Sequence, residues 1–266
     1  MQAILIATVV VAVIGLLVGV MLVSVGKKFE VKVDPREAAV RECLPGNNCG
    51  GCGFAGCDAL AGAIVAGDAP ANACPVGGAP VGDKIASIMG VDAGDAERKV
   101  AFVRCSGDCE HKLQKSNYVG IQNCEAVFAS GLNPYGCNYG CLGFGACVKV
   151  CPFGAISVKN NVAVVDRAKC KACGKCVAVC PKKLIELVPE KVVYAVRCSN
   201  REKGPIVKQS CTAGCIGCGI CAKQCENEAV RVEGNISRID YEKCVSCGKC
   251  AAKCPVKVIV DPHTIR

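Results

Sequence analysis

The sequence predicts four consecutive parts: an N-terminal transmembrane helix, a small and mainly helical cysteine-rich domain, and two α+β domains that repeat one plan. Three observations support this prediction. Residues 2–26 contain no charged side chain, 26 of the 266 residues are cysteine, and the segment "VRCS" precedes a cysteine-rich stretch at both 103–106 and 196–199. We expect the four parts to span residues 1–28, 29–95, 96–195 and 196–266.

The first part is the apolar segment QAILIATVVVAVIGLLVGVMLVSVG at residues 2–26. At about 1.5 Å per residue, a helix of this length exceeds the roughly 30 Å hydrocarbon core of a bilayer. A signal peptide would have a positive n-region and a shorter apolar core, so we expect a retained, single-pass anchor. Lys27 and Lys28 follow directly. The positive-inside rule therefore predicts an inner-membrane protein whose remaining domains face the cytoplasm.

The cysteine content is typical of either a disulfide scaffold or a metal protein. Tight C-x2-C-x2-C groups followed by C-P favour metal, and the cytoplasm keeps thiols reduced. Tryptophan is absent and aromatic residues make up 4% of the chain, so we expect bound metal to supply much of the order. The formal net charge of +9 is offset by metal-bound thiolates, and we predict no nucleic-acid partner.

The second part contains a cysteine group with the spacing C-x2-C-x4-C-x16-C. A zinc site usually has two C-x2-C pairs, whereas four soft thiolates in this arrangement favour a 4Fe-4S cluster. Residues 57–66 are alanine-rich and predict a helix that ends at Gly67. We expect a turn at 77–82 and a spare thiol at Cys43. The predicted ligands of this cluster are Cys49, Cys52, Cys57 and Cys74.

Four further groups approach the ferredoxin spacing C-x2-C-x2-C-x3-C-P. The groups that begin at Cys170 and Cys244 have the full spacing. In the group at 141–152, Phe144 stands where the middle cysteine should be. Without gaps, residues 137–152 align with 211–226, so that Phe144 matches Cys218 and Cys137 matches Cys211. We therefore predict that Cys137 supplies the missing ligand.

In two-cluster ferredoxins the fourth cysteine of each half binds the other cluster. We thus expect two α+β two-cluster (8Fe) ferredoxin-like domains and five 4Fe-4S clusters in all. Short strands are expected at 160–166 and 233–240, and short helices after Cys147, Cys176, Cys221 and Cys250. The four predicted ligand sets are Cys137, Cys141, Cys147 and Cys180; Cys151, Cys170, Cys173 and Cys176; Cys215, Cys218, Cys221 and Cys254; and Cys225, Cys244, Cys247 and Cys250.

Six cysteines remain: Cys43, Cys105, Cys109, Cys124, Cys198 and Cys211. Two interpretations stay open. Cys105, Cys109 and Cys124 could hold a sixth metal with a fourth thiol, or the six could be free, mostly buried thiols. Cys211 could also compete with Cys218 as a ligand.

The segment "LPGNNCGGCGFAGC…CPVGG", placed after the anchor and before the ferredoxin repeats, resembles the B subunit of the Rnf complex over essentially the whole chain. That resemblance implies an electron-transfer subunit of a membrane-bound ferredoxin–NAD oxidoreductase that translocates Na⁺ or H⁺. It implies reduced ferredoxin as electron donor and other membrane subunits as acceptors.

The chain lacks a catalytic constellation. We find no dinucleotide fingerprint or Walker motif, and His111 and His263 are expected at the surface, so substrate chemistry belongs to partner subunits. Two alternatives are an electron-feeding subunit of a hydrogenase or sensor-reducing system, and a non-redox metal-binding protein. A docking surface for an acidic redox partner is predicted at Lys169, Lys171, Lys175, Lys182, Lys183, Lys243, Lys249, Lys253 and Lys257.

Overall fold

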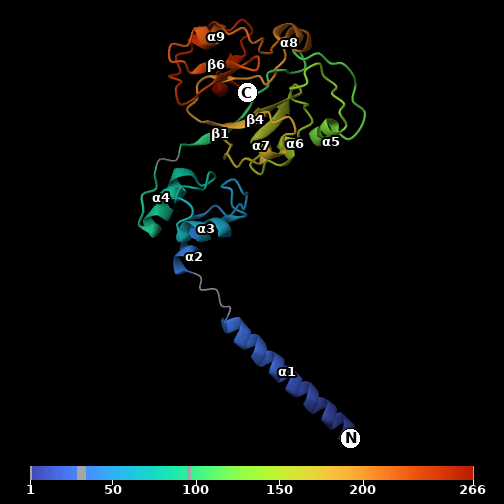
Figure 1. Ribbon diagram of the computed structural model, residues 1–266, viewed down its shortest axis with the longest axis vertical. Helices are drawn as coiled ribbons and strands as arrows, with labels where there is room; N and C mark the ends of the chain where they lie inside the picture. The colour runs from blue at the N-terminus through green and yellow to red at the C-terminus, as the bar shows by residue number, and fades with distance from the viewer. Residues whose placement is uncertain (1, 29–33, 95–96, 266) are drawn as a thin grey trace.

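A computed structural model describes residues 2–28, 34–94 and 97–265 of the chain (Figure 1). Helix α1 (Gln2–Lys28) stands apart from the rest, followed by a helical module and then by a larger body that contains the strands. Among the described residues, no helix qualifies as a candidate membrane span. The predicted boundaries at 28/29 and 95/96 touch residues 29–33 and 95–96, which lie outside the described part.

The helical module consists of α2 (Pro35–Cys43), α3 (Cys57–Ala66) and α4 (Gly78–Met89). Helix α3 ends at Gly67, whose φ of 85° is left-handed, so the predicted helix is confirmed. The turn expected at 77–82 is wrong, because α4 begins there. Pro80 lies in the first turn of α4, where the missing N–H of proline is tolerated. Apolar side chains of the three helices form a core that includes Val40, Leu60 and Ile85.

The strands of the larger body form four antiparallel pairs, two in each α+β unit. The first unit contains β1 (Lys99–Val103) with β4 (Ile185–Pro189) and β2 (Ile156–Lys159) with β3 (Val162–Val165). The second contains β5 (Ala195–Val196) with β8 (Ile259–Val260) and β6 (Val230–Glu233) with β7 (Ile236–Ile239). Each unit therefore has one hairpin and one pair formed by its first and last strands, and the predicted strands are confirmed as β3 and β7.

Short helices carry the cysteine at the third position of each ferredoxin group, and each begins one residue before that cysteine rather than after it. A glycine in the left-handed conformation precedes every one of them, which gives the chain a sharp entry into the helix. These helices are α6 (Ala146–Lys149), α7 (Lys175–Val179), α9 (Ile220–Lys223) and α10 (Lys249–Ala252). The remaining helices are α5 (Cys124–Ala129), α8 (Gly204–Ser210) and the 3₁₀ turn η1 (Pro262–Thr264).

The two units contact each other through the segments that follow β1 and β5. The Arg104 guanidinium donates to the Cys198 carbonyl at 3.3 Å, and the Ser199 hydroxyl donates to the Arg104 carbonyl at 3.1 Å. Further along, the Leu113 N–H donates to the Ser210 carbonyl at 3.0 Å. The two "VRCS" segments, which are equivalent in the repeat, therefore lie against each other.

Candidate metal centres

All 26 cysteines lie in the described residues as free thiols. No group of three or more His, Cys, Asp or Glu side chains in the described ranges has the spacing of a single-ion site. A zinc ion gathers its thiolates around one atom at about 2.3 Å. A four-iron cluster binds each of its four thiolates through a different iron, so its ligands lie further apart.

The ligands predicted for the first cluster lie around the N-terminus of α3. Cys57 begins the helix, and its N–H donates to the Asn48 side-chain oxygen at 2.8 Å. The Cys74 sulfur accepts the Gly77 N–H at 3.4 Å. Burial raises the pKa of the Cys74 thiol, and the neighbouring Cys52 and Cys57 raise it further. The structure thus brings Cys52, Cys57 and Cys74 together.

This first group borders the first ferredoxin-like unit. A Cβ placed on Gly51 would lie 2.8 Å from the carbonyl oxygen of Cys173 and 2.9 Å from its Cα. The pKa of the Cys173 thiol is raised by burial and by nearby thiols, among them Cys49. The helical module therefore meets the first unit at its own cysteine loop.

One predicted set of the first unit is brought together in the structure. The pKa of the Cys176 thiol is raised to about 12, first by burial and then by the neighbouring Cys170, Cys173 and Cys151. The Ala101 N–H donates to the Cys170 sulfur and the Ala155 N–H to the Cys151 sulfur, each at 3.3 Å. Backbone donors of this kind stabilise cluster-bound thiolates and tune cluster potentials.

The other set of the first unit differs from the prediction. Cys141, Cys147 and Cys180 line one cavity, but the fourth cysteine on it is Cys124. The pKa of the Cys147 thiol is raised to about 12 by burial and then by Cys141, Cys124 and Cys180. Cys137 does not line this cavity. Its side chain faces another cavity, where the Asn200 amide donates to its sulfur at 3.5 Å.

Phe144, which stands where the middle cysteine is missing, packs beside this cavity. Its ring contacts Tyr118 edge to face, with the centroids 5.6 Å apart, in an apolar cluster that includes Cys124. Cys124 opens α5 under the Asn123 N-cap. Because α5 is distant from the C-x2-C groups in the sequence, spacing alone gave no signal for this thiol.

The trio Cys105, Cys109 and Cys124, which the sequence left open as ligands of a sixth metal, is not grouped in the structure. Cys109 is exposed, and the other two line different cavities. The prediction that these three thiols share one metal site is therefore wrong.

The second unit repeats the arrangement. The pKa of the Cys250 thiol is raised to about 11 by burial, and Cys244, Cys221 and Cys225 are its neighbours. The pKa of Cys221 is raised by burial, with Cys215 and Cys254 nearby. Both predicted sets of this unit are therefore represented by neighbouring thiols. Their remaining members, Cys218 and Cys247, are exposed.

The cysteine loops share one backbone feature. The residue before the second position of each group, which is a cysteine in three groups and Phe144 in the other, is left-handed: Gly143, Ala172, Gly217 and Ser246, with φ of 79°, 52°, 66° and 57°. For alanine and serine this conformation costs roughly 1–2 kcal/mol, so the surrounding loop must hold it. A Cβ on Gly217 would lie 2.7 Å from the Asn235 carbonyl. Tight loops that carry cysteines and backbone N–H donors fit an iron–sulfur cluster, because the thiolates bind its irons and the N–H groups donate to its sulfur ligands.

Three family models match the cysteine-rich segments. The model described as "Putative Fe-S cluster" matches residues 44–76, and two described as "4Fe-4S dicluster domain" match residues 133–181 and 214–258. Together with the thiol geometry, these matches define an iron–sulfur protein with ferredoxin-like domains.

Similar proteins narrow this class to one family. The B subunit of the Na(+)-translocating ferredoxin:NAD(+) oxidoreductase complex of Acetobacterium woodii is 49% identical over 91% of this chain and 73% of that protein. The B subunit of the ion-translocating oxidoreductase complex of Methanosarcina acetivorans is 43% identical over 92% and 94%, respectively. The B subunit of the proton-translocating ferredoxin:NAD(+) oxidoreductase complex of Clostridium ljungdahlii is 42% identical over 90% and 85%. This chain belongs to the family of B subunits of Rnf-type, ion-translocating oxidoreductase complexes, as its resemblance implied.

Proposed function

We propose that this chain is the iron–sulfur subunit that carries electrons from reduced ferredoxin to membrane subunits of an ion-translocating ferredoxin–NAD oxidoreductase. The observation that carries the proposal is the contact between successive thiol groups. The helical module touches the first unit at Gly51 and Cys173, and the first unit touches the second through Arg104 and Cys198. Clusters bound by these groups would form one path through the protein.

Each predicted cluster supplies one-electron redox chemistry when bound. The chain's own residues would hold it and set its environment. Cys74 and Cys180 illustrate this role, because each sulfur accepts a backbone N–H, from Gly77 and Leu184, at 3.4 Å. We infer that the helical module and the second unit hold the predicted sets. In the first unit, we infer that Cys151, Cys170, Cys173 and Cys176 hold one cluster.

We infer that α1 anchors the chain in the inner membrane. Its 27 residues would extend about 40 Å, more than the roughly 30 Å hydrocarbon core. Large apolar side chains such as Leu16, Leu17 and Met21 are more than 60% exposed, which a bilayer would cover at no hydrophobic cost. Removing residues 1–28 should release the chain into the soluble fraction, whereas the full chain should resist carbonate extraction.

We infer that ferredoxin docks on the second unit beside Cys247. This thiol is exposed, and Val245 beside it is 65% exposed. Lys243, Lys253 and Lys257 are exposed in the same cysteine group. A basic rim around an exposed cluster ligand would attract an acidic partner and bring its cluster close. Lys249 already pairs with Glu226 at 2.5 Å, so it contributes less to the positive charge that would attract ferredoxin.

The experiment that tests the proposal uses the complete membrane complex, with reduced ferredoxin as donor and NAD⁺ as acceptor. The triple variant Lys243→Glu, Lys253→Glu, Lys257→Glu should raise the KM for ferredoxin roughly three- to tenfold at low salt, and less at high salt. Lys84→Glu, an exposed position in α4, is the matched control. An unchanged, salt-insensitive KM would contradict the docking surface. A complex that reduces NAD⁺ equally well without this chain would contradict the function.

A further inference from the structure

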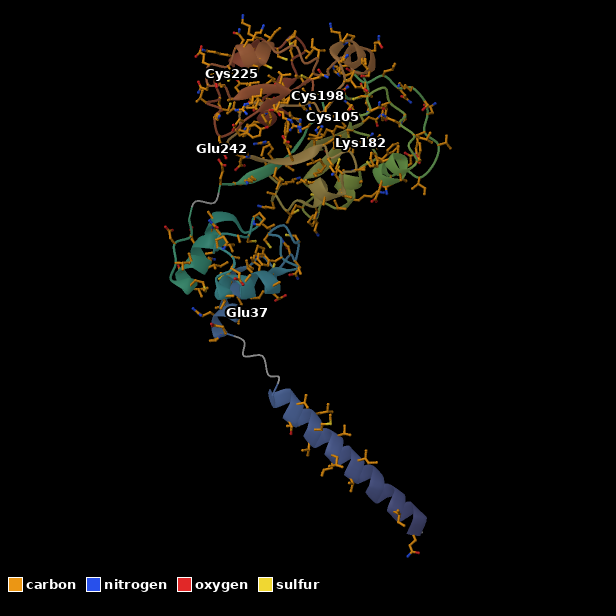
Figure 2. The ribbon with its side chains drawn as sticks, in the orientation of Figure 1. Glu37, Cys105, Lys182, Cys198, Cys225 and Glu242 are labelled. Atoms are coloured by element: carbon orange, nitrogen blue, oxygen red, sulfur yellow. The ribbon has the colours of Figure 1, made fainter. Side chains whose placement is uncertain are left out.

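Four buried cysteines meet in a cavity between the two ferredoxin-like units. Cys105 and Cys137 come from the first unit, and Cys198 and Cys211 come from the second. Each is 7–8% exposed. Figure 2 labels Cys105 and Cys198, which lie near each other within the larger body. Cys105, Cys198 and Cys211 lie outside the segments that the three family models match.

Short contacts connect these four thiols. A Cβ placed on Gly107 would lie 3.2 Å from the Cys211 sulfur and 3.7 Å from the Cys105 sulfur, so both sulfurs lie close to this glycine. Asn200, which is 1% exposed, donates its side-chain amide to the Cys137 sulfur at 3.5 Å and its backbone N–H to the Cys198 sulfur at 3.4 Å. The pKa of the Cys211 thiol is raised to about 11 by burial, and Cys105 and Cys198 add to the shift.

The site has the symmetry of the sequence repeat. Cys105 and Cys198 occupy the same position in the two "VRCS" segments, and Cys137 aligns with Cys211. The Cys105 sulfur accepts the N–H of Cys141 at 3.4 Å, and the Cys198 sulfur accepts the equivalent N–H of Cys215 at 3.3 Å. Each unit therefore contributes two equivalent thiols. In each unit, one of these thiols also accepts a hydrogen bond from the first cysteine of a ferredoxin group.

The cavity is also lined by cationic side chains. Arg104, Lys112 and Arg197 line it, and the first two are 9% and 5% exposed. The Arg197 Nε atom is buried and has no hydrogen-bond partner among the described residues. Arg104 pairs with Glu186 at 3.5 Å, which offsets part of this charge, but burying Lys112 and Arg197 beside neutral thiols is costly. A cluster with four thiolate ligands is an anion, so it would compensate this charge and could accept the free Nε–H.

We propose that Cys105, Cys137, Cys198 and Cys211 bind a sixth four-iron cluster at the junction of the two units, and that Cys124 completes the set of Cys141, Cys147 and Cys180. The inference rests on the proposed function. The bridging cluster would receive one electron from the first unit and give one to the second, or the reverse, with no bond made or broken. Ferredoxin and the acceptor subunits supply all the electrons.

The test is the iron and acid-labile sulfide content of the full chain, purified anaerobically and weighed by native mass spectrometry. Six clusters require about 24 iron and 24 sulfide atoms per chain, and five require about 20. Cys105→Ser, Cys137→Ser, Cys198→Ser and Cys211→Ser should each lose the same four irons. Their double variants should lose no more than the single ones, because all four thiols hold one cluster.

Cys109→Ser is the matched control, since Cys109 is exposed and lies in the same loop as Cys105; it should keep every iron. Cys124→Ser should lose a different cluster, and its loss should add to that of Cys198→Ser. About 20 irons in the wild type, or zinc without sulfide at the junction, would overturn the proposal. So would additive losses in the double variant Cys137→Ser, Cys198→Ser. A chain with six clusters that fails to oxidise ferredoxin would instead contradict the proposed function.

Discussion

Replacing Gly51 by alanine tests whether the helical module and the first unit touch at their cysteine loops. The φ of Gly51 lies outside the left-handed region, so alanine fits its backbone. The new Cβ would lie 2.8, 2.9 and 3.1 Å from the carbonyl oxygen, Cα and carbonyl carbon of Cys173. Normal contact needs about 3.5 Å or more, so the loops must separate by roughly 0.7 Å. Overpacking of this kind costs about 1–3 kcal/mol.

That energy shifts the equilibrium between touching and separated loops by roughly 5- to 150-fold. The variant should keep its full iron content, but the magnetic coupling between reduced clusters in the two loops should weaken in EPR spectra. Rapid-freeze experiments should show slower electron transfer between the module and the first unit. Gly62→Ala in α3 is the control, because its Cβ would meet nothing closer than 3.4 Å. Wild-type coupling and rate in Gly51→Ala would refute the contact.

Three further predictions concern the cysteine sites. Asn200→Asp removes the donor to the Cys137 sulfur and adds a buried negative charge. It should lower the reduction potential of one cluster in an EPR-monitored titration and lower the free energy of unfolding by about 1–3 kcal/mol. The control Asn227→Asp, at an exposed position, should change neither quantity. Phe144→Cys should restore the four irons lost in Cys124→Ala, because Phe144 aligns with Cys218; a double variant still short of iron would contradict the grouping of Cys124. Chelating the iron should abolish the near-UV circular dichroism of the α+β units, since bound metal holds their loops, and an unchanged spectrum would show that the fold is independent of iron.

Local chemistry explains why much of the fold could be predicted from the sequence. The helix ending at Gly67 and the turns before β3 and β7 depend on residues that adopt a left-handed backbone, namely Gly67, Asn160, Asn161, Gly234 and Asn235. The cysteine spacings likewise reflect loops that wrap one group. By contrast, α4 was missed because its first residues, "GAPVG", have low helix propensity, whereas the helix packs into the core further along, through Ile85 and Ala86.

The position of Cys137 could not be deduced from spacing, and the reason is physical. A gap-free match between two repeats identifies equivalent residues, which normally occupy separate copies of a site. When the equivalent segments of two repeats lie against each other, as the two "VRCS" segments do here, equivalent residues become neighbours. Cys137 and Cys211 are both equivalent and adjacent, since each lines the same cavity. In the structure Cys137 lines the cavity between the two units, and Cys124 lines the cavity of Cys141, Cys147 and Cys180, which is the basis of the ligand sets proposed above.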